Sequence, residues 1–195
     1  MSTSPASTLR DLFLEMEARL EREPETVQGE IVLGVYLMSP RPRPRHGGIQ
    51  INLGSELRQR FGISKGGEPP DWLFVIEPEI RSERTFSRLV PDAAGWRRST
   101  TGWPDLDKTP VTLVPEWVAE VLSPGTAATD RGPKLEAYGA MGVGWVWLLD
   151  PDARRLETLA NVRGRMVPGP AFGDGQSFTG DPFGTVPIPL DRIFV

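Results

Sequence analysis

The stretch PEWVAEVLSPGTAATDRGPKLEAYGAMGVGWVWLLDP, residues 115–151, carries the strongest indication of the fold. It begins with a short apolar run, residues 117–122, whose side chains would alternate between the two faces of a strand. A turn at Ser123-Pro124-Gly125 and a short helix over residues 134–141, with Pro133 in its first turn, are expected next. A nearly continuous apolar run, residues 144–149, then predicts a central strand buried on both faces.

The segments outside this stretch also mix helices and strands. Apolar residues spaced three and four apart predict helices over residues 9–23 and 46–61. Strand signals cover residues 27–38 (a strand or a hairpin), 72–76, 86–90 and 155–160, whereas residues 95–110 are expected to form a loop. The Gly- and Pro-rich tail is expected to be mostly irregular. We therefore predict one α/β (α+β) domain over residues 9–195, after a disordered N-terminus over residues 1–8.

Composition narrows the possible chemistry. The 195 residues include 22 Lys+Arg and 26 Asp+Glu, which gives a net charge of -4, and there is no cysteine. Disulfides, thiolate metal clusters and cysteine nucleophiles are therefore excluded, and a single histidine, His46, excludes two-histidine zinc motifs. The only lysines are Lys65, Lys108 and Lys134. Hydrolytic chemistry would have to rest on carboxylates, a lysine, a metal or a hydroxyl.

Nothing in the sequence predicts a membrane protein. No apolar run approaches the roughly 18–20 residues that a membrane span needs. The N-terminus is interrupted by Asp11, Glu15 and Glu17, so it lacks the apolar region of a signal peptide. We expect a cytoplasmic protein without a membrane partner.

Two carboxylates are the candidate metal ligands. Glu120 lies within an apolar strand, where a buried charge is costly unless it is paired or binds a cation, and Asp92 follows another strand. Two carboxylates on adjacent strands, with a backbone carbonyl between them, suit Mg²⁺. Lys134, on the following helix, could return to them. The alternative is a solvent-facing Glu120 at a sheet edge, a turn residue at Asp92 and a solvated Lys134, and spacing alone favours it.

The 115–151 stretch also resembles the signature of the Uma family of restriction endonucleases, within the PD-(D/E)XK nuclease superfamily. The matching positions are Glu120, Val121, Leu122, Ser123, Pro124, Thr126, Asp130, Lys134, Tyr138, Gly142, Val143, Trp147, Asp150 and Pro151. Further matches lie upstream, at Gly29, Glu30 and residues 42–46, 77–79 and 90–97. The likeness covers residues 25–195.

The resemblance implies a restriction-endonuclease-like core, a mixed β-sheet flanked by helices, with the active site at one end. Asp92 takes the place of the aspartate in the PD motif, and Glu120 that of the acidic residue in (D/E)XK. Val121 would offer its backbone carbonyl to the metal. Leu122 stands where the superfamily motif has lysine, and Lys134 fits a lysine that has migrated to the next helix.

Two accessory residues follow from the same resemblance. Glu30 matches an acidic residue that would contact the site through water, and His46 matches a frequent family histidine. Taken without the resemblance, His46 could be a general base or a helix-start residue that makes a hydrogen bond.

The implied activity is hydrolysis of DNA phosphodiester bonds with Mg²⁺, or Mn²⁺, as cofactor. Double-strand cutting would need two active sites, so a homodimer is expected. The alternative is a catalytically inactive nucleic-acid-binding or regulatory module with the nuclease fold, which the net charge of -4 weakly favours.

Five arginines are candidate DNA contacts. Arg41, Arg43 and Arg45 alternate with prolines and could form an extended basic arm, although a solvated loop is equally compatible with this pattern. Arg97 and Arg98 follow Trp96, and an aromatic residue beside arginine can stack on bases. A tryptophan that packs in the core is the plainer interpretation.

Overall fold

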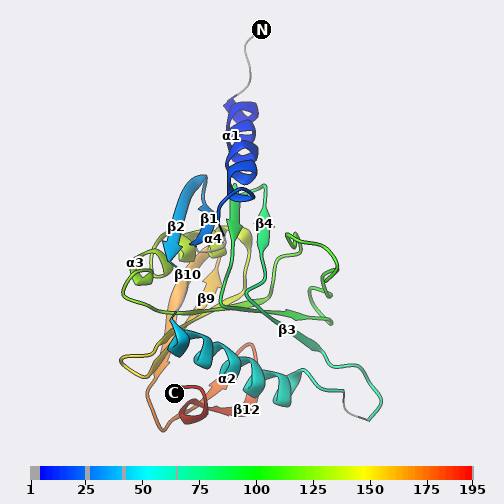
Figure 1. Cartoon of the computed structure of the whole chain (residues 1–195). Helices are drawn as coiled ribbons and strands as arrows, with labels where there is room; N and C mark the ends of the chain where they lie inside the picture. The colour runs from blue at the N-terminus through cyan, green and yellow to red at the C-terminus, as the bar shows by residue number, and fades with distance from the viewer. Residues whose placement is uncertain (1–4, 25–26, 41–42, 65, 195) are drawn as a thin grey trace.

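The computed structural model describes residues 5–24, 27–40, 43–64 and 66–194. A six-stranded sheet lies at the centre of the molecule, in the order β10-β9-β8-β7-β6-β3 (Figure 1). Its strands are β3 (Trp72–Ile76), β6 (Ala93–Arg97), β7 (Trp117–Val121), β8 (Trp145–Asp150), β9 (Arg155–Val162) and β10 (Arg165–Phe172). Only the β7–β8 pair within this sheet is parallel, so the sheet is mixed.

Residues 115–151 form the parallel pair. Between β7 and β8 the chain forms the short helix α3 (Ala127–Asp130) and then α4 (Pro133–Met141), the crossover that a parallel pair requires. All five residues of β7 are buried, and β7 lies between β6 and β8. Glu120 is therefore in the interior of the sheet, and the alternative of a solvent-facing edge position is wrong.

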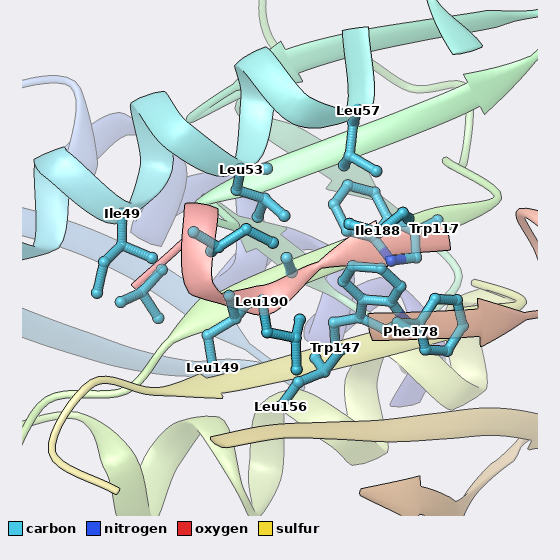
Figure 2. Close-up of a cluster of buried hydrophobic side chains, with 14 of the residues drawn as sticks. Ile49, Leu53, Leu57, Trp117, Trp147, Leu149, Leu156, Phe178, Ile188 and Leu190 are labelled. Atoms are coloured by element: carbon cyan, nitrogen blue, oxygen red, sulfur yellow. The ribbon is translucent and has the colours of Figure 1, made fainter. Parts of the chain in front are cut away.

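One face of the large sheet packs on helix α2 (Pro44–Phe61) and on the end of the chain. Trp117, Ala119 and Val121 of β7 belong to this core, as the predicted alternation requires. Three elements near the C-terminus cover the rest of this core, namely β11 (Ser177–Gly180), β12 (Gly184–Pro189) and the 3₁₀ turn η1 (Leu190–Arg192). Figure 2 shows these segments beneath α2.

The opposite face packs on α4 and on a smaller sheet. Val118 and Leu122 lie in this second core with Ala137, Tyr138 and Met141 of α4. The smaller sheet has the order β2-β1-β5-β4, formed by β1 (Val27–Val32), β2 (Val35–Pro40), β4 (Ile80–Ser82) and β5 (Ser87–Leu89). Helix α1 (Pro5–Leu20) stands at the outer end of the molecule beyond this sheet (Figure 1).

The predicted fold class, a mixed sheet flanked by helices, is confirmed. Three local predictions differ from the structure. The first helix begins at Pro5, so residues 5–8 are helical instead of disordered, and residues 1–4 lie outside the described residues. The start of the predicted 95–110 loop belongs to β6. The tail is not mostly irregular, because it forms β10, β11 and β12 by pairing with neighbouring segments. Within the described residues, no helix is long and apolar enough to cross a membrane.

Candidate active site

A cavity of about 260 Å³ lies where β1, β6, β7 and the N-terminal ends of α2 and α4 come together. Its walls include the residues predicted to carry the chemistry, namely Glu30, His46, Asp92, Glu120, Val121 and Lys134. Residues that are up to about a hundred positions apart in the chain thus meet at one place. Asp130, at the end of α3 in the chain segment that connects β7 to β8, lines the same cavity.

Glu120 is the most enclosed of the carboxylates, with 3% of its surface exposed. Its atom Oε1 accepts a hydrogen bond from the Tyr138 hydroxyl at 2.5 Å and pairs with Lys134 Nζ at 2.7 Å. Among the described residues, none donates a hydrogen bond to Oε2. One oxygen of a buried carboxylate facing the cavity is therefore left for a ligand.

Asp92 lies just before β6 and is held on both oxygens. Oδ2 accepts the backbone N–H of Val121 at 2.5 Å, which ties Asp92 to the strand that carries Glu120. Oδ1 accepts hydrogen bonds from His46 Nε2 at 2.6 Å and from Gln50 Nε2 at 2.9 Å. His46 and Gln50 are one turn apart on α2, so this helix orients the aspartate.

Lys134 is buried among three carboxylates. Its Nζ lies 2.7 Å from Glu120, 3.1 Å from Glu30 and 3.6 Å from Asp130. Glu30 also accepts the backbone N–H of Val90 at 2.8 Å, which links the lysine to the chain segment before Asp92. Glu30 thus contacts the site through its ion pair with Lys134.

Burial and the charges of neighbouring groups together shift the pKa values of the buried residues in the cavity. Burial raises the pKa of Glu120 well above its ordinary value, and the Lys134 ammonium opposes this rise. Burial likewise raises the pKa of Asp130. Burial lowers the pKa of Lys134, but the carboxylates of Glu120 and Glu30 outweigh it, so the pKa lies well above its ordinary value. The lysine is therefore charged at neutral pH.

These residues fit a hard divalent cation. Five carboxylates (Glu30, Asp92, Glu120, Asp130 and Asp152) line the cavity together with Lys134, Arg43, Arg45 and His46, and they supply the oxygen donors that Mg²⁺ prefers. An added cation would offset the excess negative charge and use the free oxygen of Glu120. Within the described residues, no three Asp, Glu or His side chains gather tightly enough to enclose a metal by themselves. Backbone oxygen and water would have to complete the ligand set.

Of the five candidate DNA-contact arginines, two lie at the cavity. Arg43 and Arg45 line it, and Arg45 is held by Asp152 at 2.8 Å and by the carbonyl of Pro151 at 2.5 Å. Arg41 lies outside the described residues.

The other two arginines lie elsewhere. Arg97 lines a second cavity, pairs with Glu116 at 3.2 Å and lies over the ring of Trp72. Arg98 is not among the residues that line the first cavity. Trp96 is fully buried and donates its indole N–H to the carbonyl of Leu113, so it packs in the core and is not available to stack on a base.

Three residues of the site were not predicted as site residues. Gln50 lies one turn after His46, Tyr138 one turn after Lys134 and Asp130 four residues before Lys134, so each lies four positions from a residue that was predicted. That i,i+4 spacing is the signal in the sequence that could have identified them.

Comparisons with known proteins agree with this arrangement. The Uma2 family model, described as "Putative restriction endonuclease", matches residues 10–189. A crystal structure from Anabaena variabilis, described as a "putative nuclease belonging to DUF820", matches with a TM-score of 0.68. The match covers 92% of this chain and 96% of that one, and at 18% sequence identity it shows the fold alone. No curated protein matches the chain.

Proposed function

The chain belongs to the Uma2 restriction endonuclease family, and from this premise we propose that it is a metal-dependent endonuclease that hydrolyses phosphodiester bonds of DNA. The observation that carries the proposal is the meeting of Asp92, Glu120 and Lys134 at one cavity. These are two carboxylates and a charged lysine, the set that metal-assisted phosphodiester hydrolysis needs.

The proposed cofactor is Mg²⁺, for which Mn²⁺ could substitute. Asp92 and Glu120 would hold it together with the backbone carbonyl of Val121. The free Oε2 of Glu120 and the excess of carboxylates support this assignment. When bound, such an ion polarises a phosphate and lowers the pKa of a bound water.

The other residues of the site would contact the phosphate, or hold the catalytic side chains in place. Lys134 would stabilise the negative charge that grows on the phosphate oxygens, or orient the attacking water. Glu30 holds the lysine ammonium in place, and His46 and Gln50 fix the orientation of Asp92. Arg43 and Arg45, at the cavity wall, are the proposed contacts to flanking DNA phosphates. Cutting both strands would take two such sites, so we expect a homodimer, acting in the cytoplasm.

The proposal is tested with Asp92→Ala, and with Asp107→Ala as control, since Asp107 is an exposed aspartate that does not line the cavity. We expect wild type and the control to bind Mg²⁺ or Mn²⁺ in calorimetry and to nick plasmid DNA. Asp92→Ala should lose both properties. A pure, folded Asp92→Ala preparation that nicks at the wild-type rate would overturn the proposal.

Lys134→Ala tests the cleavage step separately from metal binding, because Lys134 is not one of the proposed metal ligands. We expect this variant to lose nicking, because the charge beside the phosphate is gone. If wild type binds metal but never nicks DNA, the nuclease-fold binding module is the better description of the protein.

A further inference from the structure

The two donors that reach Glu120 converge on the same oxygen. The Tyr138 hydroxyl and the Lys134 ammonium both contact Oε1, at 2.5 Å and 2.7 Å. They come from successive turns of α4, on the face that packs against β7. Among the described residues, none donates a hydrogen bond to Oε2. The two oxygens of one carboxylate therefore have different roles.

The two donors also differ in how many groups they serve. Lys134 is shared among Glu120, Glu30 and Asp130, so it neutralises charge without selecting one orientation of Glu120. A phenol has a single proton to donate, and within the described residues that of Tyr138 goes to Glu120.

The ring of Tyr138 gives this hydroxyl a fixed position. Tyr138 has no exposed surface and lies in the core cluster that contains Val118, Leu122 and Met141. A tyrosine ring has few rotatable bonds, so packing of the ring also fixes the position of the hydroxyl oxygen. The outer end of a glutamate side chain is free to turn unless a neighbour holds it.

We propose that Tyr138 is a positioning residue for metal binding, which occupies Oε1 of Glu120 and so presents Oε2 to the cation. The proposal rests on the proposed function, because it concerns the same metal site. Residues that orient a metal ligand typically contribute about 10–100-fold to metal affinity. Tyr138 would act in this way without touching metal or substrate.

The test is Tyr138→Phe, which removes one hydroxyl and keeps the ring. Tyr36→Phe is the matched control, because the chain has two tyrosines and the Tyr36 hydroxyl instead donates to Glu23, at 2.9 Å. Mn²⁺ affinity is measured by calorimetry without DNA. We expect about a tenfold loss or more for Tyr138→Phe and wild-type affinity for Tyr36→Phe.

If Tyr138 acted only through packing, Tyr138→Phe would bind Mn²⁺ with wild-type affinity, because phenylalanine fills the same space. Circular dichroism and the thermal midpoint establish that the variant is folded. Tyr138→Met, with an adaptable apolar side chain, replaces it if phenylalanine is not tolerated. In a nicking assay, Tyr138→Phe should need more Mg²⁺ for half-maximal rate but approach the wild-type rate at saturating Mg²⁺.

The outcomes separate this inference from the proposed function. If wild type and a folded Tyr138→Phe bind Mn²⁺ equally, the positioning role is wrong and the metal site stands. If wild type binds no Mn²⁺, the proposed metal dependence fails, and the positioning role fails with it.

Discussion

Gly139 allows helix α4 to approach the β9–β10 turn more closely than any other residue would. A Cβ atom at this position would lie 2.6 Å from the carbonyl oxygen of Gly164, closer than side-chain carbons come to backbone atoms. We predict that Gly139→Ala lowers the free energy of unfolding by about 2 kcal/mol, because backbone must shift to accommodate the methyl group. Chemical denaturation measures the change.

Gly47→Ala is the control for this prediction. Gly47 lies in α2, and a Cβ there would meet nothing within 4 Å. Alanine in a helix is more favourable than glycine by roughly 0.5–1 kcal/mol, so this variant should be slightly more stable than wild type. Equal stability of the two variants would show that α4 does not approach the turn as closely as described.

The sequence could identify only some of the site residues at this scale. Glu120 stands out locally because a carboxylate interrupts an apolar strand. Asp92 and Lys134 were candidates from their places in the sequence, but only the family resemblance favoured them over the solvent-exposed alternative. Tyr138 and Gln50 were not predicted, because their polar partners come from other elements. A local pattern does not say which helix face will meet which carboxylate.

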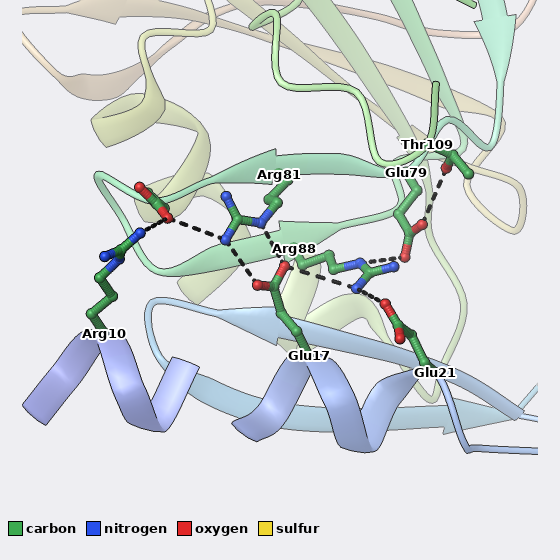
Figure 3. Close-up of polar contacts among 8 residues, drawn as sticks. Arg10, Glu17, Glu21, Glu79, Arg81, Arg88 and Thr109 are labelled. Carbon is green, nitrogen blue, oxygen red and sulfur yellow. Dashed lines mark hydrogen bonds and ion pairs between the residues drawn. The ribbon is translucent and has the colours of Figure 1, made fainter. Parts of the chain in front are cut away.

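At the scale of elements, ion pairs join helix α1 to the smaller sheet. Arg81 binds Glu17 with two hydrogen bonds, at 2.7 and 2.9 Å (Figure 3). Arg88 reaches Glu79 at 2.7 Å and Glu21 at 3.4 Å. Phe13 adds an apolar contact with Phe86. Leu9, Leu12 and Leu14 of α1 are exposed, so the helix is only partly covered by the rest of the molecule.

We predict that Arg88→Ala lowers the free energy of unfolding by about 2 kcal/mol. The Arg88 side chain is 8% exposed, and its removal leaves Glu17 and Glu79 near each other without their shared cation. The control is Arg10→Ala, which removes an arginine that is 61% exposed and paired with Glu83 on the same network. Its thermal midpoint should equal that of wild type, and a similar loss in both variants would contradict the buried role of Arg88.

The predicted elements agree best with the structure in the centre of the sheet. Strands β7 and β8 are short apolar runs, and burial on both faces makes such runs recognisable. Strand β10 was missed because it is mostly exposed and contains Pro168 and Pro170, which are typical of turns. It forms by pairing with β9, with a register shift between Pro168 and Ala171. That pairing is a tertiary property with little local signal.

Across the whole molecule, the C-terminal segment supports the site from behind α2. Ile188 and Leu190 are fully buried in the same core as Ile49 and Leu53 of this helix (Figure 2). The N-terminal part of α2 carries His46 and Gln50, which hold Asp92. The last elements of the chain and the candidate active site are therefore joined through one helix.

Ile188→Ala tests whether this closing segment is part of the cooperative core. Ile188 has no exposed surface, and its truncation should lower the free energy of unfolding by about 3 kcal/mol because a cavity forms beneath α2. Val186→Ala, on the same strand, is the control, since Val186 is 44% exposed and should change stability little. Denaturation followed by tryptophan fluorescence reports on this core directly, because Trp117 and Trp147 lie in it. If both variants unfold at the wild-type midpoint, β12 is a peripheral addition, and the support for α2 must come from the large sheet alone.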